Sequence, residues 1–443
     1  MRELSMRTFS GVVSSECRPR QSRATNYVCL FLACFSYFPR ICQAQNAPQT
    51  QQIANNKEGG IRWEMKQYPS LRFGDVLRVD FRARLQADAG SFSPDATPDK
   101  PSFTLHRARF GIQGTFLKRF EYEVERDFCD SDEPWRDVAL NYRAHRRFEI
   151  QGGRFKVPFG LDQLTRITDF DYVFRSRVSE TVAPGRDTGL MAHGRFFKRG
   201  LTYQVGAFAH DGDNAGTGQR TLAARFTGTP LRLFPAAHRL KGLRIGFAVV
   251  HSELPEGLNS LRGRTLSRDT FFNRVFVNGS RLRLGAELDW SSGPFSVKGE
   301  LLQASDTRHG QGVRAQDLPN LVSRGWYLSG TWVVTGEKKA RGLEPRRAFL
   351  RDGGWGALEL ALRCEELRLG SSSHPGPAFA HPRAANLLGN SQQIWTFGLN
   401  WYLNRHTKIQ ANAVRESLED ILRSPVPGQK LFWGQFARLQ LAF

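Results

Sequence analysis

The feature that most constrains the fold is a two-residue alternation of apolar and polar side chains that recurs along the chain. Between residues 77 and 88 every odd position is apolar and every even position is polar. The alternation returns at 107–116, 120–128, 281–289 and 395–403. Because successive side chains of a β-strand point to opposite faces, each segment predicts a strand with one apolar and one polar face.

The connections between these segments alternate in length. Short turns at 117–119, 198–200, 291–294 and 404–406 alternate with long connections such as 252–280 and 370–391. Outer-membrane barrels have short turns at one end and long loops at the other. About sixteen segments can be counted. We therefore expect an all-β chain that forms a transmembrane antiparallel up-and-down β-barrel of about 16 strands. The connections 229–240 and 335–354 are long where short ones are expected.

The hydropathy agrees with this fold. The mean hydropathy is −0.44, and no stretch approaches the roughly 18 consecutive apolar residues of a membrane helix. A helical membrane protein is thereby excluded, whereas a barrel is not, because half of its strand residues face water.

The N-terminus has the features of an export signal. Five arginines between residues 2 and 23 precede the apolar segment 27–38, and Cys42-Gln43-Ala44 places small residues before a cleavage site. We expect residues 1–44 to be a signal peptide, 45–75 a periplasmic lead-in and 76–443 the barrel, located in the outer membrane of a Gram-negative cell.

Charge and cysteine content exclude several classes of protein. Lys and Arg number 63 against 42 Asp and Glu, a formal charge of +21, which favours anionic partners. The arginines are scattered at alternate positions instead of forming basic runs, so nucleic acid is not the expected partner. Beyond residue 44 only Cys129 and Cys364 remain. Disulfides, a metal site and a cofactor are therefore not expected.

The C-terminal segment 431–443 repeats the alternation and ends on an aromatic residue. Trp433, Leu439, Leu441 and Phe443 share one face, opposite Arg438. A terminal strand of this kind is recognised by the outer-membrane assembly machinery of many porins, so we expect Leu439, Leu441 and Phe443 to be an assembly signal.

Several motifs resemble the phosphate-selective porin O/P family. They include GGRFKVPFG at 152–160, VSETVAPGRDTGL at 178–190 and YQVGAFAHDGDN at 203–214. The resemblance extends from about residue 75 to the end. It implies a 16-stranded barrel, a homotrimer, and a third long loop that folds into the lumen to form the constriction.

The polar strand faces and the third long loop contain the candidate anion contacts. Arg stays charged at every relevant pH and donates paired hydrogen bonds to phosphate or carboxylate. A series of such weak sites suits a channel that must also release the ion. The lumen-lining candidates are Arg78, Arg82, Arg84, Arg107, Arg109, Arg225, Arg244, Arg281 and Arg283; the constriction-loop candidates, in residues 160–188, are Arg166, Arg175, Arg177 and Arg186.

These residues predict a passive channel for small inorganic anions, with phosphate or polyphosphate as candidate solutes. No lysine cluster lies in residues 160–190, so general anion preference has more support than phosphate selectivity. Acidic residues such as Glu121, Glu123 and Glu125 could also pair with lumenal arginines. The alternatives are a general low-selectivity porin, a structural barrel and, least supported, an outer-membrane hydrolase, for which no Gly-x-Ser-x-Gly motif or triad spacing is present.

Overall fold

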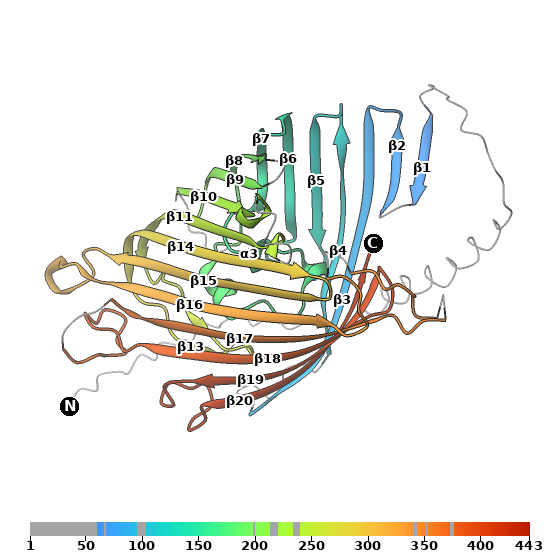
Figure 1. Cartoon of the computed structure of the whole chain (residues 1–443). Coiled ribbons are helices and arrows are strands. Elements are labelled where there is room, and N and C mark those ends of the chain that lie inside the picture. Colours follow the sequence, from blue (N-terminus) through green and yellow to red (C-terminus); the bar gives the residue numbers. More distant parts are fainter. Residues whose placement is uncertain are drawn as a thin grey trace, which may run out of the picture. The chain divides into compact units, whose positions relative to one another are not determined.

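The structure, a computed structural model, describes residues 60–65, 68–94, 103–197, 200–212, 220–233, 240–339, 343–350, 353–372 and 376–443. The expected signal peptide, residues 1–44, lies outside these ranges. Long antiparallel strands dominate the described part, and its helices are short (Figure 1). None of these helices is long and apolar enough to cross a membrane.

Sixteen strands pair in chain order, each antiparallel to the next, and the ring closes where β20 pairs with β3. At this closure Arg438 lies opposite Asp88 and Leu441 lies opposite Leu85. The predicted fold class, a closed antiparallel barrel of 16 strands, is confirmed. The strands are β3 (Leu77–Ser93), β4 (Phe103–Phe116), β5 (Phe120–Asp127), β6 (Trp135–His145), β7 (Phe148–Lys156), β8 (Arg186–Phe196), β9 (Leu201–Phe208), β10 (Thr221–Gly228), β11 (Arg244–Gly257), β14 (Val277–Ser292), β15 (Phe295–Arg308), β16 (Leu318–Val333), β17 (Ala357–Ser371), β18 (Asn390–Tyr402), β19 (Thr407–Leu418) and β20 (Leu431–Ala442).

A short hairpin precedes the ring. Strands β1 (Ile61–Met65) and β2 (Pro69–Phe73) pair with each other, and β2 pairs with the first residues of β3. It occupies the edge of β3 that β20 leaves free, since β20 pairs with β3 only from Arg84 onward. This hairpin falls in the segment expected to be a lead-in. The strands therefore begin earlier in the chain than the alternation at residue 76 indicated.

The connections differ between the two ends of the ring. At one end they are 94–102, 128–134, 157–185, 209–220, 258–276, 309–317, 372–389 and 419–430. At the other end most are short, such as 117–119, 146–147 and 293–294, but 229–243 and 334–356 are long. The predicted asymmetry and its two exceptions are both present.

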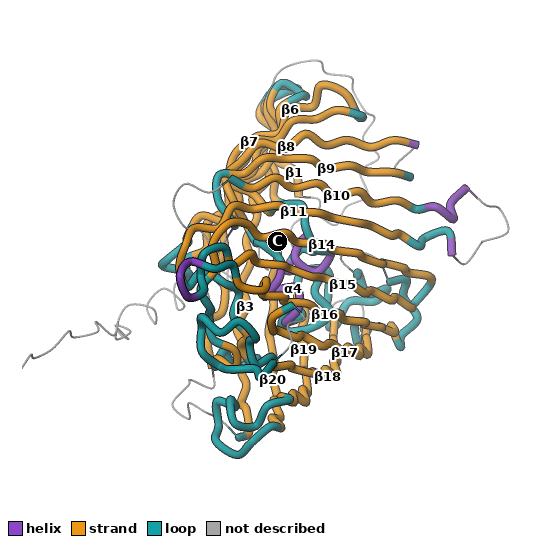
Figure 2. Tube along the Cα trace, turned by 90° about the vertical axis from the view of Figure 1, so that its left-hand side faces the viewer, coloured by secondary structure: helices purple, strands orange, loops and turns teal. Residues whose placement is uncertain are grey.

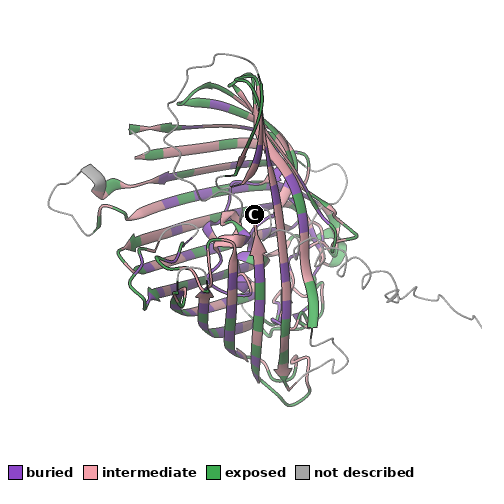
Figure 3. Ribbon diagram, turned by 90° about the vertical axis from the view of Figure 1, so that its right-hand side faces the viewer, coloured by how far each residue is buried: buried purple, intermediate pink, exposed green. Residues whose placement is uncertain are grey.

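The side chains alternate between the two faces of the ring, which Figure 3 shows as bands of buried and exposed residues along each strand. On β14, Arg281 and Arg283 are fully buried inside, whereas Leu282 and Leu284 are exposed outside. The outward face of β16–β18 is mainly apolar over four successive outward positions of each strand, from Trp332 to Trp326 on β16 and from Trp401 to Trp395 on β18. An apolar belt bordered by aromatic rings is the lipid-facing surface of outer-membrane barrels.

Phe443 completes the closure of the ring. Its backbone N–H donates to the carbonyl of Ala83 at 2.9 Å, the N–H of Ala83 donates back at 3.1 Å, and its phenyl ring stacks on His406 with centroids 4.8 Å apart.

We expect Phe443→Ala to lower the amount of assembled barrel severalfold, because it removes the aromatic side chain that the assembly machinery is expected to recognise. Heat-dependent gel mobility of outer-membrane fractions measures this, with Leu431→Ala at the other end of β20 as the control. Equal assembly of the two variants would contradict the prediction.

Candidate functional site: the lumen and its inserted loop

The connection between β7 and β8, residues 157–185, contacts inward-facing side chains of the ring and therefore lies inside the barrel; we call it the inserted loop. Figure 1 shows its first helix, α3 (Leu161–Leu164), within the ring of strands. Its second helix, α4 (Arg177–Val182), also lies there (Figure 2). Valines of α4 and Phe159 belong to an interior apolar cluster that includes Leu302 and Leu367 of the strands. Packing inside the lumen thus supplies the apolar burial that an exposed loop would lack.

Polar side chains of β14–β20 bind the backbone of the inserted loop. Glu300 of β15 accepts the N–H groups of Leu161 and Asp162 at the start of α3, the latter at 2.9 Å. Asn412 of β19 accepts the N–H of Val173 at 2.7 Å. Further bonds run from Arg283, Arg363, Asn400, Lys408, Gln410 and Gln440 to carbonyl groups of the loop. The polar anchoring of the loop is therefore mainly to β14–β20, whereas on the β7–β11 side the loop shares an apolar cluster with wall residues.

An ion-pair cluster adds to this anchoring. The carboxylate of Asp171, which is 5% exposed, lies 2.7 Å from Nζ of Lys298 and 2.5 Å from Nζ of Lys339. Lys339 also pairs with Glu359, which accepts the hydroxyl of Tyr402 at 2.7 Å. Buried charges of this kind are tolerated only when they are paired and hydrogen-bonded, as these are.

A second connection, residues 258–276, also lies inside the ring, near the end with the long connections. Its short strands β12 (Gly263–Arg264) and β13 (Thr270–Phe272) pair with each other. The amide of Asn390 donates to the carbonyl of Phe271 at 3.1 Å, and Glu416 accepts the N–H of Leu266 at 3.1 Å. Arg177 of the inserted loop donates to the carbonyl of Arg264 at 3.2 Å, which joins the two segments. The sequence pattern did not predict this second insertion.

A cavity of about 1220 Å³, which we call the vestibule, lies between the inserted loop and the end with the short turns. Ten of its lining residues are basic and three are acidic. The basic ones are Arg82, Arg84, Arg166, Arg195, Arg225, Arg244, Lys298, Lys339, Arg405 and Lys408; the acidic ones are Asp169, Asp289 and Glu344. Arg166, Arg195 and Arg405 are exposed, and their side chains make no ion pair or hydrogen bond with another described residue. Six of the ten basic residues pair with carboxylates, so the positive charge that the vestibule presents to a solute comes mainly from Arg166, Arg195 and Arg405.

On the other face of the inserted loop, positive charges lie close together across the lumen. Arg107 of β4 donates to the amide oxygen of Gln86 at 2.7 Å; Arg438, Arg109 and Arg175 lie near enough to repel its charge, and Asp88 attracts it. No described carboxylate forms an ion pair with Arg107. Arg175 donates to carbonyl groups of its own loop, including that of Thr165 at 3.4 Å, and lies 4.3 Å from the centroid of the Phe170 ring. We call Arg107 and Arg175 the constriction pair.

Most of the other predicted wall arginines face the lumen but are paired with carboxylates. The pairs are Arg78–Asp80, Arg82 with Glu123 and Glu125, Arg84–Glu125, Arg109 with Asp127 and Glu125, Arg225–Glu287 and Arg244–Asp289. Pairing of this kind was one of the alternatives that the sequence left open. Pairing weakens the electrostatic potential that each arginine produces in the lumen, but each guanidinium stays on the inner wall.

Four candidates do not line the path as predicted. Arg281 and Arg283 point inward but are fully buried, and both bind Asp211. Arg177 is 5% exposed and pairs with Glu180 at 2.7 Å. Arg186 is the first residue of β8 and pairs with Asp137 at 2.8 Å, so it belongs to the wall and not to the inserted loop. Arg177, Arg281 and Arg283 hold the loops in place, because their donors already bind loop residues.

The lysines that contact the inserted loop were not found from the sequence. Lys298, Lys339 and Lys408 come from β15, the connection 334–356 and β19, yet all three bind residues 168–171. Lys156, at the end of β7, donates to the carbonyl of Gln163 at 2.6 Å. The search for a lysine cluster within residues 160–190 could not detect residues that the fold brings there from elsewhere.

With the barrel and its lumen described, comparison with known proteins decides the family. The family model described as phosphate-selective porin O and P matches residues 79–427. The chain belongs to this porin family. The match covers more than three quarters of the chain, and it confirms the resemblance seen in the motifs. No curated protein matches the sequence.

Solved structures of outer-membrane proteins share the fold of this porin at low identity. The anion-selective porin from Comamonas acidovorans has a TM-score of 0.50 at 13% identity, covering 83% of this chain and 100% of the other. The outer membrane channel DcaP of Acinetobacter baumannii gives 0.52 at 12%, covering 83% and 98%. The trimer form of OmpT of Vibrio cholerae gives 0.51 at 9%, covering 83% and 100%. These likenesses concern the fold, and together with the family they support an outer-membrane porin and not an enzyme.

Proposed function

We propose that this porin is a passive diffusion channel that prefers small anions. The basic residues of the vestibule carry this proposal, because Arg166, Arg195 and Arg405 line one confined cavity and their side chains have no carboxylate partner among the described residues. Low-dielectric walls focus such a field and raise the local concentration of anions. The constriction pair extends the positive charge past the inserted loop, and several weak sites in series allow an anion to leave again.

Within this class we propose phosphate and polyphosphate as solutes. Guanidinium groups donate two parallel hydrogen bonds to phosphate, and the exposed Arg166 of the inserted loop lines the vestibule without a carboxylate partner among the described residues. Lys298, Lys339 and Lys408 line the same cavity but are bound to Asp171 and to loop carbonyls. We also propose that the functional unit is a homotrimer in the outer-membrane lipid, as in the trimer form of OmpT of Vibrio cholerae, and that residues 1–44 direct export.

Single-channel recording tests the proposal. Purified chain in a planar bilayer should give open-channel current, and added phosphate should reduce the chloride current. Arg166→Gln should weaken this block about fivefold, the factor that corresponds to ~1 kcal/mol for a unit charge at 4 Å in water. Arg78→Gln is the matched control, because Arg78 is already paired with Asp80 at 2.7 Å.

The outcomes separate the alternatives. Absence of current would favour a structural barrel. Current without phosphate block would leave an anion channel that does not bind phosphate, and equal effects of Arg166→Gln and Arg78→Gln would remove Arg166 from the proposed site.

A further inference from the structure

Two arginines lie side by side on the outer face of the barrel, where apolar residues are expected. Arg324 of β16 and Arg368 of β17 are directly opposite in the strand register, and Gln303 of β15 lies opposite Arg324 on the other side. All three are exposed outward positions. Like charges directly opposite one another on a sheet destabilise it, so this arrangement calls for a counter-charge.

The counter-charge within the described chain serves only one of the two arginines. Glu366 accepts a hydrogen bond from Nε of Arg368 and another from the indole N–H of Trp326 at 3.2 Å. Glu419 adds a weaker attraction to Arg368. The guanidinium of Arg324 makes no ion pair or hydrogen bond with any other described residue. Its donors and the remaining N–H groups of Arg368 therefore face outward together.

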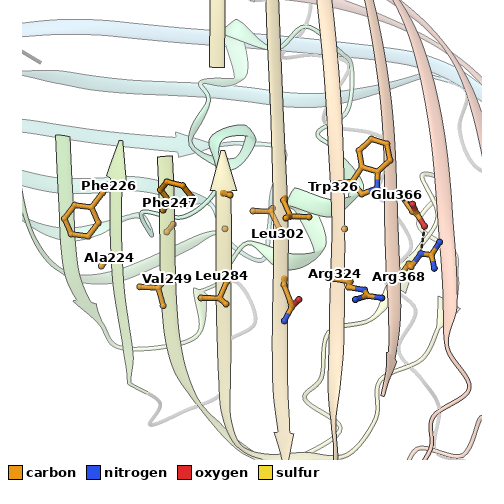
Figure 4. A pocket seen from close by; sticks show the side chains of 16 residues that line it. Ala224, Phe226, Phe247, Val249, Leu284, Leu302, Arg324, Trp326, Glu366 and Arg368 are labelled. Carbon is orange, nitrogen blue, oxygen red and sulfur yellow. Dashed lines mark hydrogen bonds and ion pairs between the residues drawn. The ribbon is translucent and has the colours of Figure 1, made fainter. Parts of the chain in front are cut away.

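An apolar hollow of about 830 Å³ adjoins this pair on the outer face (Figure 4). It extends across β10, β11, β14, β15 and β16, where the small outward residues Ala224 and Ala286 lie among the larger Phe226, Phe247 and Leu301. Figure 4 shows Arg324 and Arg368 at the opposite end of this row from Phe226, with Trp326 and Glu366 beside them. One continuous surface therefore offers an apolar groove and a basic end.

The position along the strands matches a lipid headgroup. Arg368 lies three residues before the end of β17 at Ser371, on the side of the long connections, which outer-membrane barrels turn outward. On β16 the outward residues from Trp332 to Trp326 are apolar, glycine or aromatic, and Arg324 is the first charged one. Tryptophan marks the membrane interface, where lipid phosphates lie.

We propose that this surface binds a phosphate-bearing lipid of the outer leaflet, with the phosphate on Arg324 and Arg368 and an acyl chain in the hollow. Paired guanidinium groups suit phosphate oxygens. An acyl chain packed against Phe226, Phe247 and Leu301 would bury apolar side chains that the barrel leaves exposed, which is favourable.

Native mass spectrometry of the purified full chain tests this. The protein is titrated with bis-phosphorylated lipid A and with the same lipid after removal of its phosphates. Wild type should retain the phosphorylated lipid about tenfold better, and Arg324→Gln/Arg368→Gln should lower its retention to that of the dephosphorylated lipid. Tenfold corresponds to about 1.4 kcal/mol, close to the low end for one hydrogen bond to a charged group. Arg415→Gln is the matched control, because Arg415 is another outward arginine, between Trp395 and Trp433 in the register.

Two results would overturn the proposal. Equal retention of the phosphorylated lipid by the double variant and wild type would show that the pair does not bind phosphate. Loss of the oligomer in the double variant, with lipid retention unchanged, would assign this face to contacts between copies of the chain. The channel conductance of each variant verifies that the barrel is intact. The lipid proposal does not depend on the anion preference of the lumen.

Discussion

Asp171→Asn should release the inserted loop from the wall and give larger, noisier single-channel currents. Asp171 neutralises Lys298 and Lys339 in a buried cluster, and removal of one partner from such a cluster costs about 3–5 kcal/mol, because the other charges stay buried. The barrel strands keep their pairing, so the loss should be confined to the loop.

Asp169→Asn is the control for this variant. Asp169 lines the vestibule two residues away, makes no ion pair among the described residues, and accepts one hydrogen bond from Thr168 at 3.3 Å. The substitution removes the same charge without breaking the cluster. Wild-type conductance and noise in Asp171→Asn would show that the cluster does not hold the loop.

The same cluster predicts a pH dependence. Burial by itself would raise the pKa of Asp171, but Lys298 and Lys339 outweigh burial and hold that pKa below its usual value. A carboxyl with a lowered pKa contributes its full stabilisation above the ordinary value of about 4 and loses it as pH falls through the lowered pKa. Conductance should therefore stay constant from neutral pH to about 4 and become noisy only in stronger acid. Noise that appears already near pH 6 would contradict this assignment.

Substitution of the constriction pair should have the largest effect on selectivity. Arg107→Gln and Arg175→Gln each remove a charge that no described carboxylate pairs with, so each should lower the chloride-to-potassium permeability ratio about fivefold at low salt. The effect should shrink at high salt, where screening shortens the reach of each charge.

Arg126→Gln is the matched control for this pair. Arg126 lies on the outward face of β5, against the rings of Phe128 and Trp135. It should leave the permeability ratio unchanged. An equal decrease in all three variants would mean that overall charge, and not its place in the lumen, sets the selectivity.

The sequence predicted the wall better than the lumen. Alternation placed Arg82, Arg107 and Arg225 on the inner face, because a two-residue period depends only on neighbouring positions. It could not show that Arg281 forms an ion pair with Asp211, which lies 70 residues away in the connection after β9. The positions of the lysines around Asp171 and the insertion of residues 258–276 into the lumen likewise depend on contacts between residues more than 100 positions apart in the sequence. The prediction that the third long loop folds into the lumen came from the family resemblance, because alternation alone does not indicate it.

The reversal potential of the wild-type channel in a KCl gradient tests the central claim most directly. An anion-preferring pore moves the potential toward the chloride equilibrium value, and the excess of basic residues in the vestibule predicts this sign. A potential on the potassium side, from a channel that is open and stable, would contradict the account of the lumen while leaving the barrel and its family in place.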